Sequence, residues 1–216
     1  MLVNAVLKVV LVDVNADVVR AWRSAFSDLP EVSVVHGSIL EQRTDAWVTP
    51  TNARGSMDGG VDAVIKRHLG ASIEKKVQKA IRTQFKGLMP VGSATCVPTG
   101  DSVPRYLIST PTMLASAEDV SETMNVALAC AAAFQMIHQQ NAKEPGSITS
   151  VAIPGLGVGT GGVPVRVCAN LMWTGYTLFT DHRYRDFDDM RGAVREQIDE
   201  VPDWTEQTRV RIRTPK

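Results

Sequence analysis

Two glycine-rich segments constrain this chain most, because each follows an apolar run and precedes the expected start of a helix. They read NARGSMDGGVD at residues 52–62 and PGLGVGTGGVP at residues 154–164. Glycine adopts positive φ readily and lets backbone N–H groups approach a ligand closely. The N-terminus of a helix also favours anions. Two such loops that meet at one site would form a pocket for a diphosphate.

The order of apolar runs predicts an α/β fold. Strands are expected at residues 6–12, 32–36, 46–48, 94–97, 106–109 and 148–153. Helices are expected at residues 18–26, 61–69, 72–85, 121–140, 165–179 and 186–201, with Asn15 and Ser121 as N-caps. This alternation is typical of a layered fold with a mostly parallel, helix-covered sheet, which binds ligands at the carboxyl ends of its strands. Both glycine-rich loops leave such ends, so they can meet at one edge of the sheet.

Length and charge set the domain organisation and exclude one class of partner. The chain has 216 residues, enough for one sizeable domain, which we place at residues 1–200 with a flexible C-terminal tail at 201–216. Lys plus Arg and Asp plus Glu both number 23, which argues against a dedicated nucleic-acid-binding protein. A basic run is interpreted as a solvated face, with contact to a polyanion as the alternative. It consists of Lys66, Arg67, Lys75, Lys76, Lys79 and Arg82.

The cysteine pattern predicts neither a metal site nor a disulfide framework. Cys96, Cys130 and Cys168 are odd in number and far apart, and no Cys/His cluster has metal-ligand spacing. No cofactor is expected. The N-terminus lacks a basic region before an apolar run, and no apolar stretch reaches the roughly 18 residues of a membrane span. We therefore expect a cytoplasmic protein with reduced thiols and no membrane contact.

The two glycine-rich loops also carry candidate site residues. Gly157, Gly159 and Gly162 fit the pattern GxGxxG, which alone is weak support for a nucleotide site. Asp62 falls in the first turn of a predicted helix, where the dipole should keep it ionised at neutral pH and able to orient a water. Asn52 could hold a pair of ligand hydroxyls or instead form an Asx-turn.

Four blocks of the chain together resemble the macrodomain family. The segment DAWVTPTN at residues 45–52, followed by GGVD at 59–62, is similar to the family's Asn-Ala-Ala-Asn segment and its Gly-Gly-Gly-Val-Asp helix start. Residues 37–39 resemble its Gly-Asp-Ile, and residues 153–164 resemble its second loop. The blocks run in the family's order over roughly Val32 to Asp181. The resemblance implies a divergent bacterial or phage-type member with a three-layer α/β/α fold around a mixed, mostly parallel sheet.

The resemblance also implies a ligand and a set of site residues. Macrodomains bind ADP-ribose, and many remove it from proteins or from small conjugates. By this similarity Asn52 contacts the distal ribose, and Asn52 and Asp62 are the catalytic candidates. The ligand-binding positions implied are Ser38 and Ile39 beside adenine, Asn52, then Gly59, Gly60 and Val61, and in the diphosphate loop Gly157, Val158, Gly159, Thr160, Gly161 and Gly162.

Six positions depart from the family pattern. Ser38 stands in place of the adenine-reading Asp, Thr49 in place of the first Asn, Pro50 and Thr51 in place of the two alanines, Asp58 in place of a loop glycine, and Gly161 in place of an aromatic residue at the distal ribose. Loss of the carboxylate at position 38 removes a charge-assisted hydrogen bond worth about 1.5–3 kcal/mol. Gly161 leaves the pocket more open. These changes are consistent with a preference for a different nucleotide derivative.

Three functions are compatible with these residues. The first is a macrodomain that hydrolyses ADP-ribosyl conjugates at the distal ribose, with Asn52 on the ribose, Asp62 positioning a water and the loop amides holding the diphosphate. The second is a module that binds ADP-ribose, or a protein or small molecule bearing it, without turnover. The third is a Rossmann-like NAD- or S-adenosylmethionine-dependent enzyme in which Asp13 binds ribose, although the required glycine-rich N-terminus is absent.

Overall fold

A six-stranded mixed sheet forms the centre of the molecule. The computed structural model describes residues 7–181 and 184–199. The strand order is β2-β1-β6-β3-β5-β4, and every neighbouring pair is parallel except β4 with β5. The expectation of a mostly parallel sheet is therefore confirmed, with one antiparallel strand at the edge. The strands are β1 (Lys8–Asp13), β2 (Val32–His36), β3 (Ala46–Asn52), β4 (Thr95–Pro98), β5 (Tyr106–Met113) and β6 (Ser150–Ile153).

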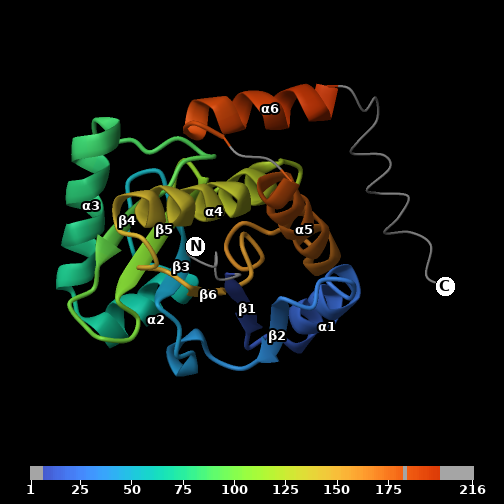
Figure 1. Ribbon diagram of the computed structural model, residues 1–216, viewed down its shortest axis with the longest axis horizontal. Helices are drawn as coiled ribbons and strands as arrows, with labels where there is room; N and C mark the ends of the chain where they lie inside the picture. Colours follow the sequence, from blue (N-terminus) through green and yellow to red (C-terminus); the bar gives the residue numbers. More distant parts are fainter. Residues whose placement is uncertain (1–6, 182–183, 200–216) are drawn as a thin grey trace.

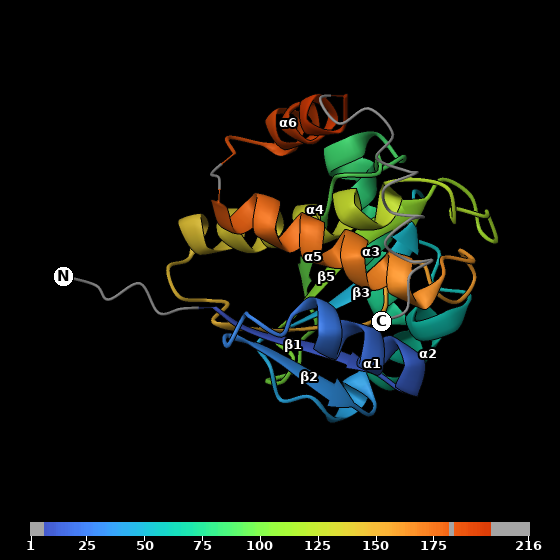
Figure 2. The ribbon, with the colours of Figure 1, turned by 90° about the vertical axis from the view of Figure 1, so that its right-hand side faces the viewer.

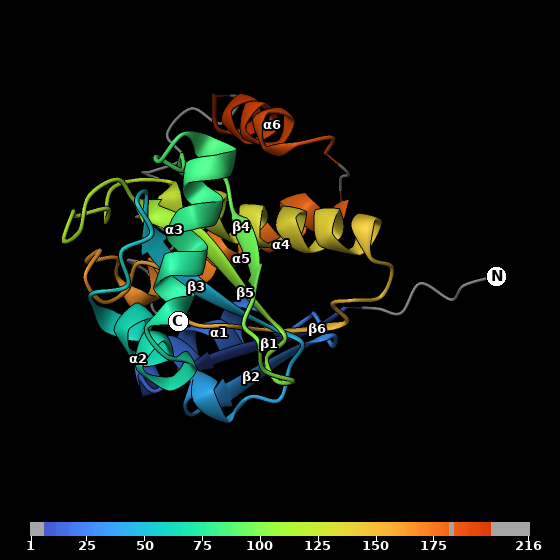
Figure 3. The same ribbon diagram turned by 90° about the vertical axis from the view of Figure 1, so that its left-hand side faces the viewer.

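Helices cover both faces of the sheet and complete three layers (Figure 1). One layer holds α1, α4 and α5, with α6 packed on the outside of α4 (Figure 2). The opposite layer holds α2 and α3, which lie along β3 and β4 (Figure 3). The helices are α1 (Ala16–Ala25), α2 (Gly60–Leu69), α3 (Ser72–Phe85), α4 (Asn125–Lys143), α5 (Val165–Asp181) and α6 (Phe187–Asp199).

Each central strand supplies side chains to both hydrophobic cores, because successive residues of a strand point to opposite faces. Leu11 and Val48 pack in the core beneath α1, α4 and α5. Their chain neighbours Val12 and Trp47 pack in the core beneath α2 and α3. A strand buried on both faces reads as a continuous apolar run, which explains why the central strands were predictable.

Strands β3 and β5 extend further than the sequence predicts, because each passes through a proline. Pro50 was expected to end the third strand, yet β3 continues to Asn52. β6 pairs with β3 only at Ala46 and Trp47, so at Pro50 the strand β3 has a neighbour on one side alone, and such an edge position tolerates proline. β5 likewise passes Pro111 beyond the last residue that pairs with β4.

Helix α4 starts later than predicted. Ser121 was expected to cap it, but the helix begins at Asn125, whose N–H donates to the Thr123 hydroxyl at 3.3 Å. The preceding segment is held instead by the second glycine-rich loop, since the N–H of Val120 donates to the carbonyl of Gly161 at 2.9 Å.

The boundary at residue 200 and the tail expected at 201–216 lie outside the described residues.

Two helical glycines with different surroundings predict opposite effects on stability. A Cβ added to Gly175 of α5 would lie 2.5 Å from the carbonyl oxygen of Ala127 in α4. Gly175→Ala should therefore lower the free energy of unfolding by about 1–3 kcal/mol, as overpacking typically does. A Cβ added to Gly192 in α6 would meet no atom within 4 Å, so Gly192→Ala should raise it by about 0.5–1 kcal/mol through helix propensity. Urea unfolding checks both, and equal effects would contradict the packing account.

Candidate functional site

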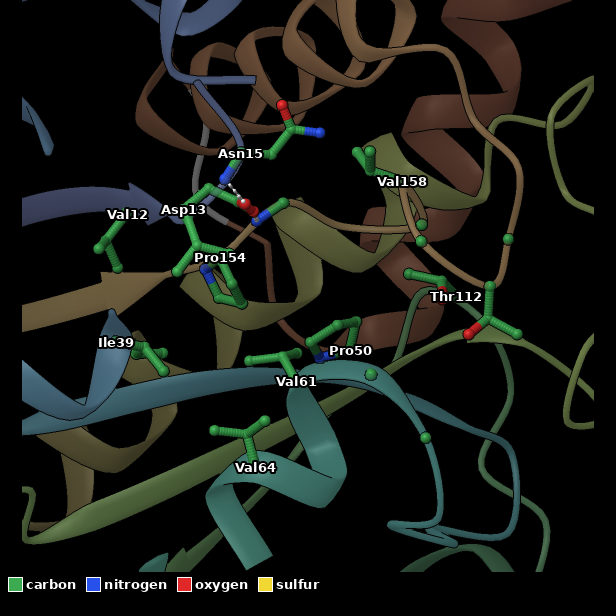
Figure 4. A pocket seen from close by; sticks show the side chains of 18 of the residues that line it. Val12, Asp13, Asn15, Ile39, Pro50, Val61, Val64, Thr112, Pro154 and Val158 are labelled. Carbon is green, nitrogen blue, oxygen red and sulfur yellow. Dashed lines mark hydrogen bonds between the residues drawn. The ribbon is translucent and has the colours of Figure 1, made fainter. Parts of the chain in front are cut away.

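A cavity of about 420 Å³ lies at the carboxyl ends of the parallel strands. This volume is within the range of small-molecule sites. Residues at or just after the ends of β1, β2, β3, β5 and β6 form its walls. Figure 4 shows Asp13 and Asn15 on one side of the cavity, facing Pro50, Val61 and Val64 on the other. The lining consists of residues 12–15, 37–39, 59–61, 154–155 and 157–161, together with Pro50, Val64, Thr112 and Met113.

Most of the site residues expected from the sequence come together on this cavity. Asn52, Asp62 and Gly162 are not part of its lining. The lining also includes residues that the macrodomain resemblance did not place at the site, above all the segment from Val12 to Asn15 at the end of β1. The expected residues that do line the cavity are Ser38, Ile39, Gly59, Gly60, Val61, Gly157, Val158, Gly159, Thr160 and Gly161.

The two glycine-rich loops face one another across the cavity. A Cβ added to Gly59 would lie 4.0 Å from the Thr160 hydroxyl oxygen. Gly59 is also the N-cap of α2 and offers no side-chain cap, so the first N–H groups of that helix are left for another acceptor. Gly60 and Val61 carry two of these groups, and both residues line the cavity. The first loop therefore presents the positive end of a helix to the cavity.

The second loop is held by hydrogen bonds that leave a row of its amides unused. The N–H of Gly162 donates to Gly159 at 3.2 Å, and the N–H of Val163 donates to Gly157 at 3.0 Å. Within the part of the chain that the structure describes, the N–H groups of residues 157–161 donate to no acceptor. Gly161 must be glycine, because a Cβ there would lie 2.7 Å from the carbonyl oxygen of Gly157. The turn therefore fixes a set of free backbone donors beside the cavity.

Asn52 holds the first loop in place through hydrogen bonds of its side chain. Its side-chain oxygen accepts from the N–H groups of Arg54 at 3.0 Å and Ser56 at 3.2 Å, which is an Asx-turn arrangement. Its side-chain nitrogen donates to the hydroxyl of Ser116 at 2.9 Å. The residue is 6 % exposed. The amide of Asn52 is thus already engaged within the protein.

Asp62 lies beneath the same loop and is 5 % exposed. Its carboxyl group accepts a hydrogen bond from the Thr49 hydroxyl. Burial raises the pKa of Asp62 to about 8; the hydrogen bond from Thr49 opposes this rise, while the nearby carboxylates of Asp58 and Glu74 add to it. The expectation that Asp62 stays ionised at neutral pH is therefore wrong. The desolvation of a buried carboxylate outweighs its favourable position in the first turn of a helix.

The electrostatics of the cavity come from backbone groups and one carboxylate. Asp13 is the only charged residue among the described residues that line it. The basic run of α2 and α3 is engaged in part elsewhere, since Lys66 pairs with Glu74 at 2.7 Å and Lys76 donates to the carbonyl of Thr99 at 2.7 Å. The donors available to an anionic ligand in this cavity are backbone N–H groups and neutral side chains such as Thr160.

The described residues provide neither a cluster of metal ligands nor an accessible thiol at the cavity. Across residues 7–181 and 184–199, no group of three or more His, Cys, Asp or Glu side chains could hold a metal ion. Cys168 is fully buried, and burial raises the pKa of its thiol to about 12, which suits a core residue.

None of the helices in this part of the chain is long and apolar enough to cross a membrane.

Comparison with known proteins identifies the family. The sequence model of the Macro domain matches residues 48–172, which is more than half of the chain. The chain belongs to the macrodomain family. An uncharacterised protein of Aquifex aeolicus is 39 % identical over 142 residues, which cover 66 % of this chain and 78 % of that protein. The family assignment excludes the Rossmann-like alternative.

Solved macrodomain structures share the fold. The macrodomain of Mycobacterium tuberculosis DarG superposes with a TM-score of 0.55 at 25 % identity, over 65 % of this chain and 86 % of that chain. Thermosipho africanus DarTG in complex with ADP-ribose superposes with a TM-score of 0.51 at 16 % identity, over 77 % of this chain and 49 % of that chain. The family match begins after β2, so the β1–α1–β2 unit, which supplies Asp13 and Ser38 to the cavity, precedes it.

The buried carboxyl group of Asp62 predicts a distinctive pH dependence of stability. In the unfolded chain its pKa returns to about 4. Between about pH 4 and pH 8 the folded protein therefore holds a proton that the unfolded chain releases, so this contribution to stability falls as the pH rises.

Asp62→Asn keeps a neutral group at every pH and removes this dependence. The free energy of unfolding of the variant, relative to the wild type, should rise by on the order of 1 kcal/mol per pH unit between pH 5 and pH 7. Urea unfolding of both proteins over this range measures the difference, in which the other titrating groups cancel. A difference that does not change with pH would show that Asp62 is ionised in the folded protein.

Proposed function

We propose that this macrodomain binds ADP-ribose, free or attached to a protein or small molecule, in the cavity between its two glycine-rich loops. The observation that carries the proposal is the row of free N–H groups at residues 157–161, opposite the uncapped N-terminus of α2. Such groups bind phosphate oxygens by hydrogen bonding and by the helix dipole. The relative solved with ADP-ribose supports the choice of ligand.

The cavity suits a ligand with a charged centre and less polar ends. The diphosphate would lie between the loops, where backbone donors are concentrated. None of the described side chains that line the cavity carries a positive charge. The nucleoside would extend toward Ile39, which is 5 % exposed, and Ser38 at the end of β2. The distal ribose would extend toward the first loop, whose shape depends on Asn52.

A variant of the second loop tests the binding site. Gly161→Ala would place a Cβ against the carbonyl of Gly157 and 2.8 Å from a methyl group of Val120, so the loop must shift. We expect calorimetric titration to show ADP-ribose binding that is clearly tighter than NAD binding in the wild type, and at least tenfold weaker ADP-ribose binding in the variant, or about 1.4 kcal/mol. Gly192→Ala, in α6, is the matched control and should bind as the wild type does. Absence of ADP-ribose binding by the wild type would overturn the proposed function.

Hydrolysis at the distal ribose is the second candidate, and it rests on the positions of Asn52 and Asp62 in the family pattern. With an ADP-ribosylated protein, a water oxygen bonds to C1″, the bond from C1″ to the leaving group breaks, and the proton that the water loses passes to the leaving group. With O-acetyl-ADP-ribose, the water oxygen bonds to the acetyl carbon, the ester bond breaks, and the proton passes to the ribose oxygen. Neither side chain lines the cavity, so both would act as positioning residues: Asn52 through the shape of the first loop and Asp62 through the start of α2. The substrate's own diphosphate would be the group nearest the water.

The hydrolytic proposal has its own test. Consumption of O-acetyl-ADP-ribose and of an ADP-ribosylated protein is followed over time with wild type and with Asp62→Ala, which removes the carboxyl group and its hydrogen bond with Thr49. Hydrolysis that depends on Asp62 predicts a kcat at least tenfold lower in the variant, with ADP-ribose affinity within a few-fold of the wild type. No consumption by the wild type would leave a binding module without turnover. Full turnover by the variant would remove Asp62 from the mechanism.

A further inference from the structure

The cavity contains one feature that a diphosphate site does not explain, namely a carboxylate. Asp13 ends β1, and no Lys, Arg or His is among the described residues that line the cavity with it. A carboxylate without a cationic partner repels phosphate, so it is unsuited to the part of the ligand that the glycine-rich loops bind. Its lone pairs are suited instead to a hydrogen-bond donor on a less charged part of the ligand.

The protein holds this carboxylate in a fixed position. One oxygen accepts from the N–H of Asn15 at 2.8 Å, and the other accepts from the N–H of Gly155 at 3.1 Å (Figure 4). Gly155 makes the second bond feasible, because a Cβ on it would lie 2.8 Å from the same Asp13 oxygen. An ionised carboxylate has about four lone-pair sites, so acceptor capacity remains on both oxygens after these two bonds. Asp13 is thus a preorganised acceptor on the cavity wall.

Asp13 lies beside the end of the cavity assigned to the nucleoside. β1 and β2 are parallel neighbours, Asp13 pairs with His36, and the N–H of Gly37 donates to the Asp13 carbonyl at 3.0 Å. The next residue is Ser38, whose hydroxyl oxygen already accepts from the N–H of Leu40 at 3.2 Å. Asp13, rather than Ser38, therefore supplies the strong acceptor at this end.

The other residues at the nucleoside end of the cavity discriminate little between bases. The described lining contains no aromatic side chain, and the neighbours of Asp13 and Ser38 include Val12, Ile39 and Pro154. Aliphatic side chains contact any purine face equally well. Asp13, in contrast, is a half-buried acceptor, and an analogue that lacks the matching donor cannot make this hydrogen bond.

Taken together, and resting on the proposed function, the geometry points to Asp13 as the residue that selects the base: it accepts a hydrogen bond from an exocyclic amine and so favours adenine over hypoxanthine. Hypoxanthine carries a carbonyl oxygen where adenine carries its amine, so two acceptors would face each other. Asp13 comes from a strand that precedes the family match. Its carboxylate would replace the contact with the base that the family's Asp makes and that the hydroxyl of Ser38 cannot make in the same way.

Calorimetry with two ligands tests this assignment on the unaltered protein. The wild type should bind ADP-ribose at least tenfold more tightly than inosine diphosphate ribose. Equal affinities would overturn the role of Asp13 while leaving the proposed function intact. Failure to bind either ligand would overturn the proposed function, and the base assignment with it.

A variant pair attributes the preference to the residue. Asp13→Asn offers an amide that can donate as well as accept, so the ratio of the two affinities should fall to within threefold of unity. Asp17→Asn, an exposed position in the first turn of α1 outside the cavity, is the control and should keep the wild-type ratio. An Asp13→Asn protein that folds and keeps the wild-type ratio would also overturn the assignment.

Discussion

The site depends on backbone N–H groups that the protein itself leaves without acceptors. The described residues that line the cavity include no cationic side chain, so the amides of residues 157–161 and the first turn of α2 are the main groups that could hold an anion there. Those amides are free because the loop closes on itself through Gly157 and Gly159, and because Gly161 has no Cβ to push it open. Donors fixed in this way need no reorganisation when a phosphate arrives.

The residues that look catalytic in the sequence act, in the folded protein, on the shape of this backbone. Asn52 ties the first loop to the end of β3, and Asp62 is a buried acid bonded to Thr49 below the start of α2. Both lie one layer behind the cavity wall. In the proposed function, their effect on a ligand passes through the position of Gly59 and Gly60.

Local chemistry was predictable from the sequence, and non-local pairing was not. The bounds of α3 and the placing of both glycine-rich loops followed from helical periodicity and from the backbone demands of glycine. The extension of β3 through Pro50 depends on how short its neighbour β6 is, which the segment itself does not encode. The protonation of Asp62 depends on its burial in the folded protein. The place of Asp13 in the cavity depends on β1 lying between β2 and β6, a strand order that no local pattern reveals.

The most direct test of the amide-lined site is an NMR titration of ¹⁵N-labelled protein with ADP-ribose, followed through its backbone amide signals. The account predicts the largest shifts at residues 157–161 and at Gly60 and Val61, because their N–H groups gain phosphate acceptors. Ribose without phosphates should leave these signals in place. Binding that shifts signals on the basic face of α3 and spares both loops would contradict the central claim.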